Sequence, residues 1–160
     1  MDKKKIIAII LLIIICILIS YILYQTVLSP KDNVIELDNI TFNTTNATDF
    51  KINETNETEG LTTYRDDNGT GRVTVNIFED DKSEYGALLL HTGVENSKAN
   101  LPSQEINGVV IYTTSSNSGK YAGEPRYVAY IYNKDLNIDV ILSSPDSNET
   151  VKMASSLKFN

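Results

Sequence analysis

The sequence RYVAYIYNKDLNIDVILS, residues 126–143, predicts the central element of the fold. Two runs rich in β-branched and aromatic residues, 126–132 and 136–143, flank the polar turn sequence Asn-Lys-Asp at 133–135. In the second run apolar residues occupy every other position, and Ile141 makes the opposite side of the strand partly apolar. This pattern predicts an antiparallel β-hairpin that contributes to the core.

More strands are predicted on the N-terminal side of this hairpin. Residues 61–65 and 72–78 flank a turn-rich Asp-Asp-Asn-Gly sequence at 66–69, and β-branched residues alternate with polar ones in the second run. Such a pattern is typical of a half-buried hairpin. Residues 34–37 and 40–42 could each add a short strand.

One helix is predicted between the two hairpins. Asp81 and Glu84 have the spacing of a capping box, and the apolar positions that follow share one helical face, so we expect a helix that ends at about His91. Residues 94–103 are expected to form a loop. An Asn-Gly turn then introduces a strand within the β-branched and aromatic run 105–112.

A second helix is predicted at the C-terminus. Pro145 ends the preceding strand, and either Asp146 or Ser147 can cap the helix. Its expected apolar stripe consists of Val151, Ala154 and Leu157. Together these elements predict an α+β fold, in which one or two helices cover one face of an antiparallel sheet.

The N-terminal segment is predicted to be a transmembrane helix. Residues 6–23 are apolar except for Ser20 and Tyr21, and a helix of this length rises about 27 Å, close to the thickness of a hydrocarbon core. Lysines at 3–5 precede the run, which predicts a cytoplasmic N-terminus and an extracytoplasmic remainder at the cell membrane.

Two other interpretations of this segment stay open. A cleavable signal peptide also begins with basic residues and an apolar stretch, although this stretch is longer than the usual signal core and no small-x-small site follows it. In a lipoprotein, Cys16 would carry the lipid, but isoleucines occupy the positions before it where small residues are wanted.

The expected domain organisation has three parts. Residues 1–28 form a cytoplasmic tip and anchor, 29–60 form a linker and an Asn/Thr-rich segment that is either a loop or an edge strand, and 61–160 form the α+β domain. Cys16 is the single cysteine, so no disulfide can stabilise the domain.

The net charge bears on the kind of partner. The chain carries 14 basic and 21 acidic residues, for a net charge of −7. Without Asp2 and the lysines at 3–5, 11 basic and 20 acidic residues remain, a net charge of −9. This acidity argues against nucleic acid as a partner, because phosphate binding needs a basic surface. It suits the solubility of an outward-facing domain.

Seven Asn-x-Ser/Thr triplets are possible glycosylation sites, which agrees with export of the domain. Five of them crowd between residues 39 and 58, although the abundance of Asn and Thr also produces such triplets by chance. The acceptor residues are Asn39, Asn43, Asn46, Asn53, Asn56, Asn68 and Asn148.

The sequence contains little that indicates catalysis, a metal or a cofactor. His91 is the single histidine, which excludes a multi-histidine metal site within one chain, and no Gly-x-Ser-x-Gly motif is present. The carboxylates at 79–81 match no EF-hand loop and are explained by the start of a helix. We therefore expect no metal, no cofactor and no catalytic residues.

Tyrosines are concentrated in and around the 126–143 hairpin. Tyr130 and Tyr132 point to one face of their strand and Tyr127 to the other, so they cannot form a single patch. Because tyrosine is enriched in recognition surfaces, the loop before this hairpin is a candidate partner-contact site. Its residues are Lys120, Tyr121, Glu124 and Arg126.

The segment 106–159 resembles the second half of the PsbP and Mog1-like α+β sandwich. The resemblance lies in the order of elements: an Asn107-Gly108 turn into a strand, two long strands, and a closing helix that ends in the sequence MASSLKF at 153–159. With its lysine-led anchor and Asn/Thr-rich segment, the chain also resembles small surface-anchored proteins of methanogenic archaea whose roles are unassigned. PsbP-type members act mostly as binding or assembly factors, which implies a similar role here.

The expected function is a non-enzymatic binding or assembly module outside the cytoplasm, with an extracytoplasmic protein or cell-surface component as partner. One alternative is a cell-wall-associated hydrolase that uses paired carboxylates such as Glu84, Glu105 or Glu124. Another alternative is a glycosylated structural protein of the cell surface.

Overall fold

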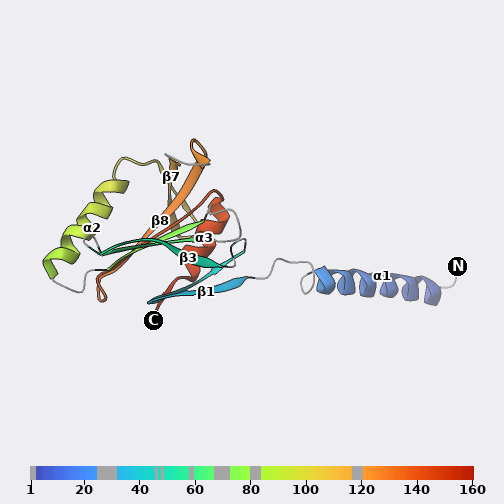
Figure 1. Cartoon of the computed structure of the whole chain (residues 1–160). Helices are drawn as coiled ribbons and strands as arrows, with labels where there is room; N and C mark the ends of the chain where they lie inside the picture. The colour runs from blue at the N-terminus through green and yellow to red at the C-terminus, as the bar shows by residue number, and fades with distance from the viewer. Residues whose placement is uncertain are drawn as a thin grey trace. The chain divides into compact units, whose positions relative to one another are not determined.

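The computed structural model of the 160-residue chain is drawn in Figure 1. It describes residues 3–24, 32–45, 47, 49–57, 60–66, 73–79, 84–116 and 121–160, without the side chains at 3–4, 7–9 and 84–90. The chain divides into two compact units, Met1–Lys31 and Asp32–Asn160.

The first unit contains the helix α1, Lys3–Leu23. Its described large apolar side chains point into solvent, with exposed fractions between 48% and 62% from Ile10 to Tyr24. Across the residues that the structure describes, no helix meets the requirements of length and apolarity for crossing a membrane, so the predicted transmembrane span is not supported there.

The second unit is built on a seven-stranded antiparallel sheet in the order β3-β4-β5-β9-β8-β7-β6. The two predicted hairpins are confirmed, because β4 pairs with β5 and β8 with β9. The strand predicted after the Asn-Gly turn is β7, and its pairing with β6 makes a third hairpin that was not predicted. The bounds of the strands are β3 Phe50–Asn56, β4 Leu61–Asp66, β5 Thr74–Glu79, β6 Ser103–Ile106, β7 Val109–Ser115, β8 Pro125–Asn133 and β9 Ile138–Ser144.

Local turn chemistry explains two of these hairpins. Asn107 and Gly108 both have positive φ, as a two-residue type I′ turn requires. In the β8–β9 turn the side-chain oxygen of Asn133 accepts hydrogen bonds from the backbone N–H groups of Asp135 and Leu136. The hairpins are therefore specified by their own residues.

Helices lie on both faces of this sheet, whereas the sequence analysis expected helices on one face (Figure 1). Val75, Val140 and Leu142 share the core face, which helix α3, Ser147–Ser156, covers with Val151 and Met153. Residues of odd number in β9 point to the opposite face. Helix α2, Glu84–Lys98, lies on that face, where its His91 contacts Asp139 of β9.

The predicted end of α2 at His91 is wrong, because the helix continues to Lys98. The loop expected at 94–103 therefore begins only after Lys98. Within the extension of α2, Glu95 and Lys98 form an ion pair with the i, i+3 spacing of a helix, and Lys98 lies in the last turn, where a cation interacts favourably with the helix dipole. The capping box at Asp81 falls outside the described residues.

A second, three-stranded sheet has the order β1-β2-β10, with bounds Asn33–Leu37, Ile40–Thr44 and Lys158–Phe159. Its Ile35, Leu37, Ile40 and Phe42 belong to the same hydrophobic core as the large sheet. The short strands expected at 34–37 and 40–42 are β1 and β2, and the Asn/Thr-rich segment contains the end strand β3, one of its two expected forms. The folded unit begins at Asp32.

Helix α3 confirms the prediction of a capped core helix. Asp146 is its N-cap and accepts a hydrogen bond from the backbone N–H of Asn148. Val151 is buried, and Ala154 and Leu157 pack partly buried against the core. Met153 is fully buried as well, because α3 contacts both sheets and therefore needs a wider apolar face.

Candidate functional site

The most concentrated group of titratable and aromatic side chains lies between α2 and the outer face of the large sheet. We call it the α2 interface. From the helix it includes His91, Glu95 and Lys98, which follow the i, i+4, i+7 spacing of one helical face. From the sheet it includes Tyr112, Tyr130, Tyr132 and Asp139.

His91 is held on two sides. Its Nδ1 lies 2.9 Å from Oδ1 of Asp139, and its ring stacks on Tyr132 with ring centres 3.7 Å apart and planes 15° from parallel. Its Nε2 lies 3.9 Å from Oε1 of Glu95. Carboxylates therefore face both ring nitrogens, and the imidazole positions α2 on the sheet.

Lys98 makes the second contact of the interface. Its Nζ lies 2.5 Å from Oε1 of Glu95, 5.6 Å from the ring centre of Tyr130 and 5.9 Å from that of Tyr112. The two tyrosine rings meet edge to face, 5.2 Å between centres. Cation–π attraction at such distances is worth about 0.5–1 kcal/mol at partly exposed sites.

Asp139 is the buried charge of this interface, with only 4% of its surface exposed. Burial raises the pKa of the Asp139 carboxyl above its ordinary value, while the hydrogen bond and positive charge of His91 act in the opposite direction. The α2 interface thus contains a carboxylate whose desolvation opposes folding.

The described contacts of His91 bear on the chemistry that the α2 interface can perform. A nucleophile paired with His91 would need a hydroxyl or thiol beside a ring nitrogen, but the contacts described for both nitrogens are with carboxylates. Among the residues that the structure describes, no group of three His, Cys, Asp or Glu side chains could hold a metal ion.

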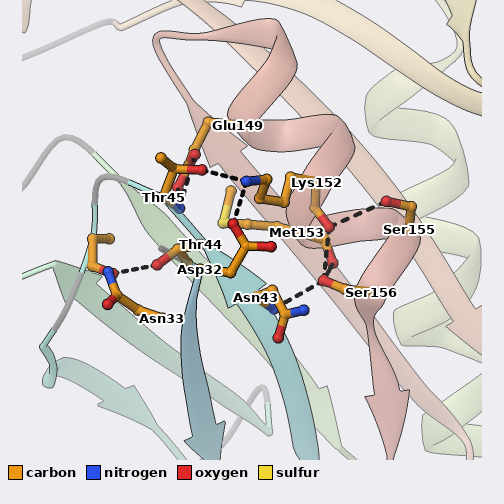
Figure 2. Close-up of polar contacts among 11 residues, drawn as sticks. Asp32, Asn33, Asn43, Thr44, Thr45, Glu149, Lys152, Met153, Ser155 and Ser156 are labelled. Carbon is orange, nitrogen blue, oxygen red and sulfur yellow. Dashed lines mark hydrogen bonds and ion pairs between the residues drawn. The ribbon is translucent and has the colours of Figure 1, made fainter. Parts of the chain in front are cut away.

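A second polar group fastens the N-terminal hairpin to α3 (Figure 2). Glu149 is buried, and its two carboxylate oxygens accept hydrogen bonds of 2.9 and 3.2 Å from the backbone N–H of Thr45. Lys152 donates to Oδ1 of Asp32 at 2.5 Å and to Oγ1 of Thr45 at 2.6 Å. We call this group the α3 clamp.

Strand β2 and the chain beyond it add to the α3 clamp (Figure 2). The backbone N–H of Asn43 donates to Oγ of Ser156 at 2.8 Å. The carbonyl oxygen of Ala47 accepts from the Thr44 hydroxyl and, at 3.3 Å, from the side-chain amide of Asn33. The clamp therefore fixes the chain where it enters the folded unit, at Asp32.

The predicted partner-contact residues are only partly brought together. Tyr121 and Glu124 share a turn closed by a backbone hydrogen bond of 3.1 Å, and both are half-buried. Arg126 donates to Oγ1 of Thr74 and Oγ of Ser143, at 2.9 and 2.8 Å, across the outer face of the large sheet. Lys120 lies outside the described residues.

The proposed hydrolase carboxylates lie on different elements. Glu105 is exposed on β6 and Glu124 lies in the β7–β8 loop, while the side chain of Glu84 is outside the described part. Of the possible glycosylation sites, Asn39, Asn43, Asn53, Asn56 and Asn148 are described, and Asn46 and Asn68 are not.

Sequence reasoning missed the pairing of His91 with Asp139. These residues are 48 positions apart, and Asp139 lies on the face of β9 that alternation assigned to the polar side. The available signal was Ile141, which made that face partly apolar and indicated that something covers it. The prediction that Tyr130 and Tyr132 share a face is confirmed by their contacts with α2.

Comparison with models of known protein families finds no match for this sequence. Comparison with curated proteins finds no significant match either.

Proposed function

We propose that this protein is a membrane-tethered binding or assembly module, with α1 as its anchor and the unit Asp32–Asn160 outside the cytoplasm. The observation that carries the proposal is the surface of α1. Between Ile10 and Tyr24 its described large apolar side chains are all about half exposed or more. A continuous apolar surface of this kind is typical of segments that contact a membrane or another protein.

The sequence extends this apolar surface beyond the described side chains. The run begins at Ile6, so 18 residues are available to the helix, and the lysines at 3–5 favour a cytoplasmic N-terminus. The folded unit has a net negative charge, which suits an outward-facing domain. The resemblance to PsbP-type proteins supports binding or assembly in place of catalysis.

Membrane extraction tests the anchor. The full-length protein is expected in the membrane fraction after washing with high salt and alkaline carbonate, and Leu12→Arg with Ile13→Arg is expected to release most of it. Leu136→Arg is the matched control, because Leu136 is an apolar residue of the folded unit that is 47% exposed. A wild-type protein that leaves the membrane in the carbonate wash overturns the proposal.

Orientation is tested with single cysteines, since Cys16 is the native one. In a Cys16→Ala background, a membrane-impermeant maleimide is expected to label Leu136→Cys in intact cells and Lys4→Cys only after lysis. The reverse pattern overturns the extracytoplasmic placement.

Binding is tested by crosslinking in intact cells, followed by purification of the full-length protein and mass spectrometry. Specific partners are expected, with recovery reduced several-fold by Tyr121→Ala. Lys134→Ala, in the β8–β9 turn, is the control for an exposed change elsewhere. Equal recovery from both variants contradicts a contact at Tyr121, and a protein without reproducible partners contradicts the binding role.

A further inference from the structure

Strand β3 forms one end of the large sheet, with β4 on one side and no described strand on the other. An end strand offers unpaired backbone N–H and C=O groups to other chains, which favours association between molecules. Ile52 in the middle of β3 is 62% exposed, so the edge also presents an apolar side chain. Such an edge normally carries a protective feature.

The pairing between β3 and β4 is interrupted at Asn53. Ile52 pairs with Tyr64 and Glu54 with Thr63, which leaves Asn53 as the extra residue of a β-bulge. Asn53, Glu54 and Thr55 are all exposed. The amide and the hydroxyl of this Asn-x-Thr triplet are therefore both accessible on the surface of the folded domain.

The triplet at Asn148 differs from that at Asn53 because its hydroxyl residue is buried. Asn148 is exposed, but its Thr150 is 0% exposed, and the Thr150 hydroxyl bonds to the carbonyl oxygens of Tyr127 and Asp146 and to Oγ of Ser144. A glycosylating enzyme has to engage the hydroxyl residue together with the asparagine. In the folded protein Thr150 is not accessible for that purpose.

Two more triplets are also engaged in the fold. Asn43 lies in the central strand of the small sheet, and its Thr45 belongs to the α3 clamp. The Asn39 side chain donates a hydrogen bond of 2.8 Å to Glu79, and its Thr41 bonds to Asn160. Their modification would have to break these contacts.

We propose that Asn53 carries an N-linked glycan that covers the outer edge of β3. The amide nitrogen of Asn53 bonds to the anomeric carbon of a sugar supplied as a lipid-linked phosphate. The bond from that carbon to the phosphate breaks, the phosphate leaves with the electron pair, and the amide loses a proton. This inference rests on the proposed extracytoplasmic location, where such acceptors are modified.

The test is peptide mass spectrometry of the full-length protein from the membranes of its native host. Trypsin cleaves after Lys51 and Arg65, so peptide 52–65 contains the acceptors Asn53 and Asn56. It also cleaves after Lys134 and Lys152, and Asn148 is the single acceptor in peptide 135–152. We expect glycan mass on peptide 52–65 of the wild type and of Thr55→Ser, loss of one glycan from this peptide in Thr55→Ala, which leaves the Asn56 triplet intact, and an unmodified peptide 135–152.

Three results overturn the inference: an unmodified peptide 52–65, the same glycan mass on this peptide in Thr55→Ala as in the wild type, or modification of Asn148 in place of Asn53. Maleimide labelling of Leu136→Cys separates a failure of the Asn53 site from a failure of the proposed extracytoplasmic location. Labelling in intact cells with an unmodified peptide 52–65 contradicts the Asn53 site alone, and absence of labelling contradicts the proposed location as well.

The covering role has its own readout. Asn53→Gln leaves the edge strand without its glycan, so size-exclusion chromatography of the detergent-extracted protein is expected to show more self-association than for Asn148→Gln. Identical elution of both variants and the wild type means that the glycan does not cover the edge.

Discussion

At the scale of single residues, Asp139 is the side chain whose burial is hardest to reconcile with stability. Its carboxylate lies 2.9 Å from Nδ1 of His91, and Glu95 and Lys98 are near enough to influence its pKa in opposite directions. Desolvation is the largest influence on its pKa. A buried ion pair of this kind often contributes little net stability, because taking the charges out of water offsets their attraction.

The first prediction concerns Asp139→Asn. The folded state raises the pKa of this carboxyl, so the folded state binds the proton more tightly than the unfolded state. Stability is then lost as the pH rises from the ordinary value of 3.8 through the raised pKa in the folded state. Asparagine keeps a hydrogen-bond acceptor for His91 without the charge, so the variant is expected to lack this pH dependence.

Thermal unfolding of the full-length protein in detergent, followed by circular dichroism, measures this effect. Asp139→Asn and the wild type are expected to have similar melting temperatures below pH 4. Towards pH 7 the variant is expected to be at least as stable. A variant clearly less stable than the wild type at pH 7 would show that the pair with His91 outweighs desolvation.

The second prediction removes the partner instead. His91→Ala leaves Asp139 buried without its hydrogen-bond donor and removes the ring stacked on Tyr132. An unsatisfied buried charged group costs about 1–3 kcal/mol or more. Hydrogen exchange is expected to increase across α2, and Asn96→Ala, an exposed change on the same helix, is expected to have little effect. Unchanged exchange in His91→Ala would mean that other contacts dock α2.

At the scale of elements, α2 and α3 are held by different mixtures of contacts. Helix α3 buries Val151 and Met153 in the core beside the hydrogen-bonded Glu149. The described half of α2 buries Val94 and meets the sheet through His91, Lys98 and their aromatic partners. The burial of apolar side chains does not depend on pH, whereas the contact between His91 and Asp139 does. We therefore expect α2 to unfold locally before α3.

The third prediction measures the apolar contribution. Met153→Ala removes a fully buried side chain from the helix that contacts both sheets, and it is expected to destabilise the domain by roughly 2–5 kcal/mol. Urea unfolding followed by tyrosine fluorescence suits the chain, which has nine tyrosines and no tryptophan. Ser155→Ala is the control on the exposed side of α3, and equal stability of the two variants would place Met153 outside the core.

The elements predicted from the sequence are those with local causes. The Asn107-Gly108 turn and the Asp146 cap depend on adjacent residues, so both could be recognised before the structure was known. The extension of α2 to Lys98 has a local part, the Glu95–Lys98 ion pair, and a part that the sequence does not show, the contacts of Lys98 with Tyr112 and Tyr130 from other elements. The Asn53 triplet could be found in the sequence, but its bulge and exposure required the pairing of β3.

At the scale of the whole molecule, the folded unit joins its two chain ends. Strand β10 at the C-terminus pairs with β2, and the backbone N–H of Asn160 donates to the carbonyl oxygen of Asn39. Such pairings link residues more than 100 positions apart, so no local sequence pattern predicts them. The strands at 34–37 and 40–42 could be expected from the sequence, whereas the pairing of β2 with β10 could not.

The last prediction concerns the point where the chain enters this domain. Lys152→Met removes the ion pair with Asp32 and the hydrogen bond to Thr45, while Glu149 still holds the Thr45 backbone. Because Lys152 and Asp32 are both partly exposed, the ion pair contributes at most about 1 kcal/mol, and overall stability is expected to change little.

The protection of backbone amides against hydrogen exchange is expected to change more than overall stability, because the α3 clamp acts where strand β1 begins. Hydrogen exchange of the full-length protein is expected to rise severalfold at 33–37 in Lys152→Met and to stay unchanged in the core strands β5 and β9. Lys158→Met, which removes an exposed lysine from β10, is the matched control. Equal exchange at 33–37 in the two variants would mean that strand pairing alone fixes the entry point, because the Lys152 contacts would then add nothing to the backbone bonds between β1 and β2.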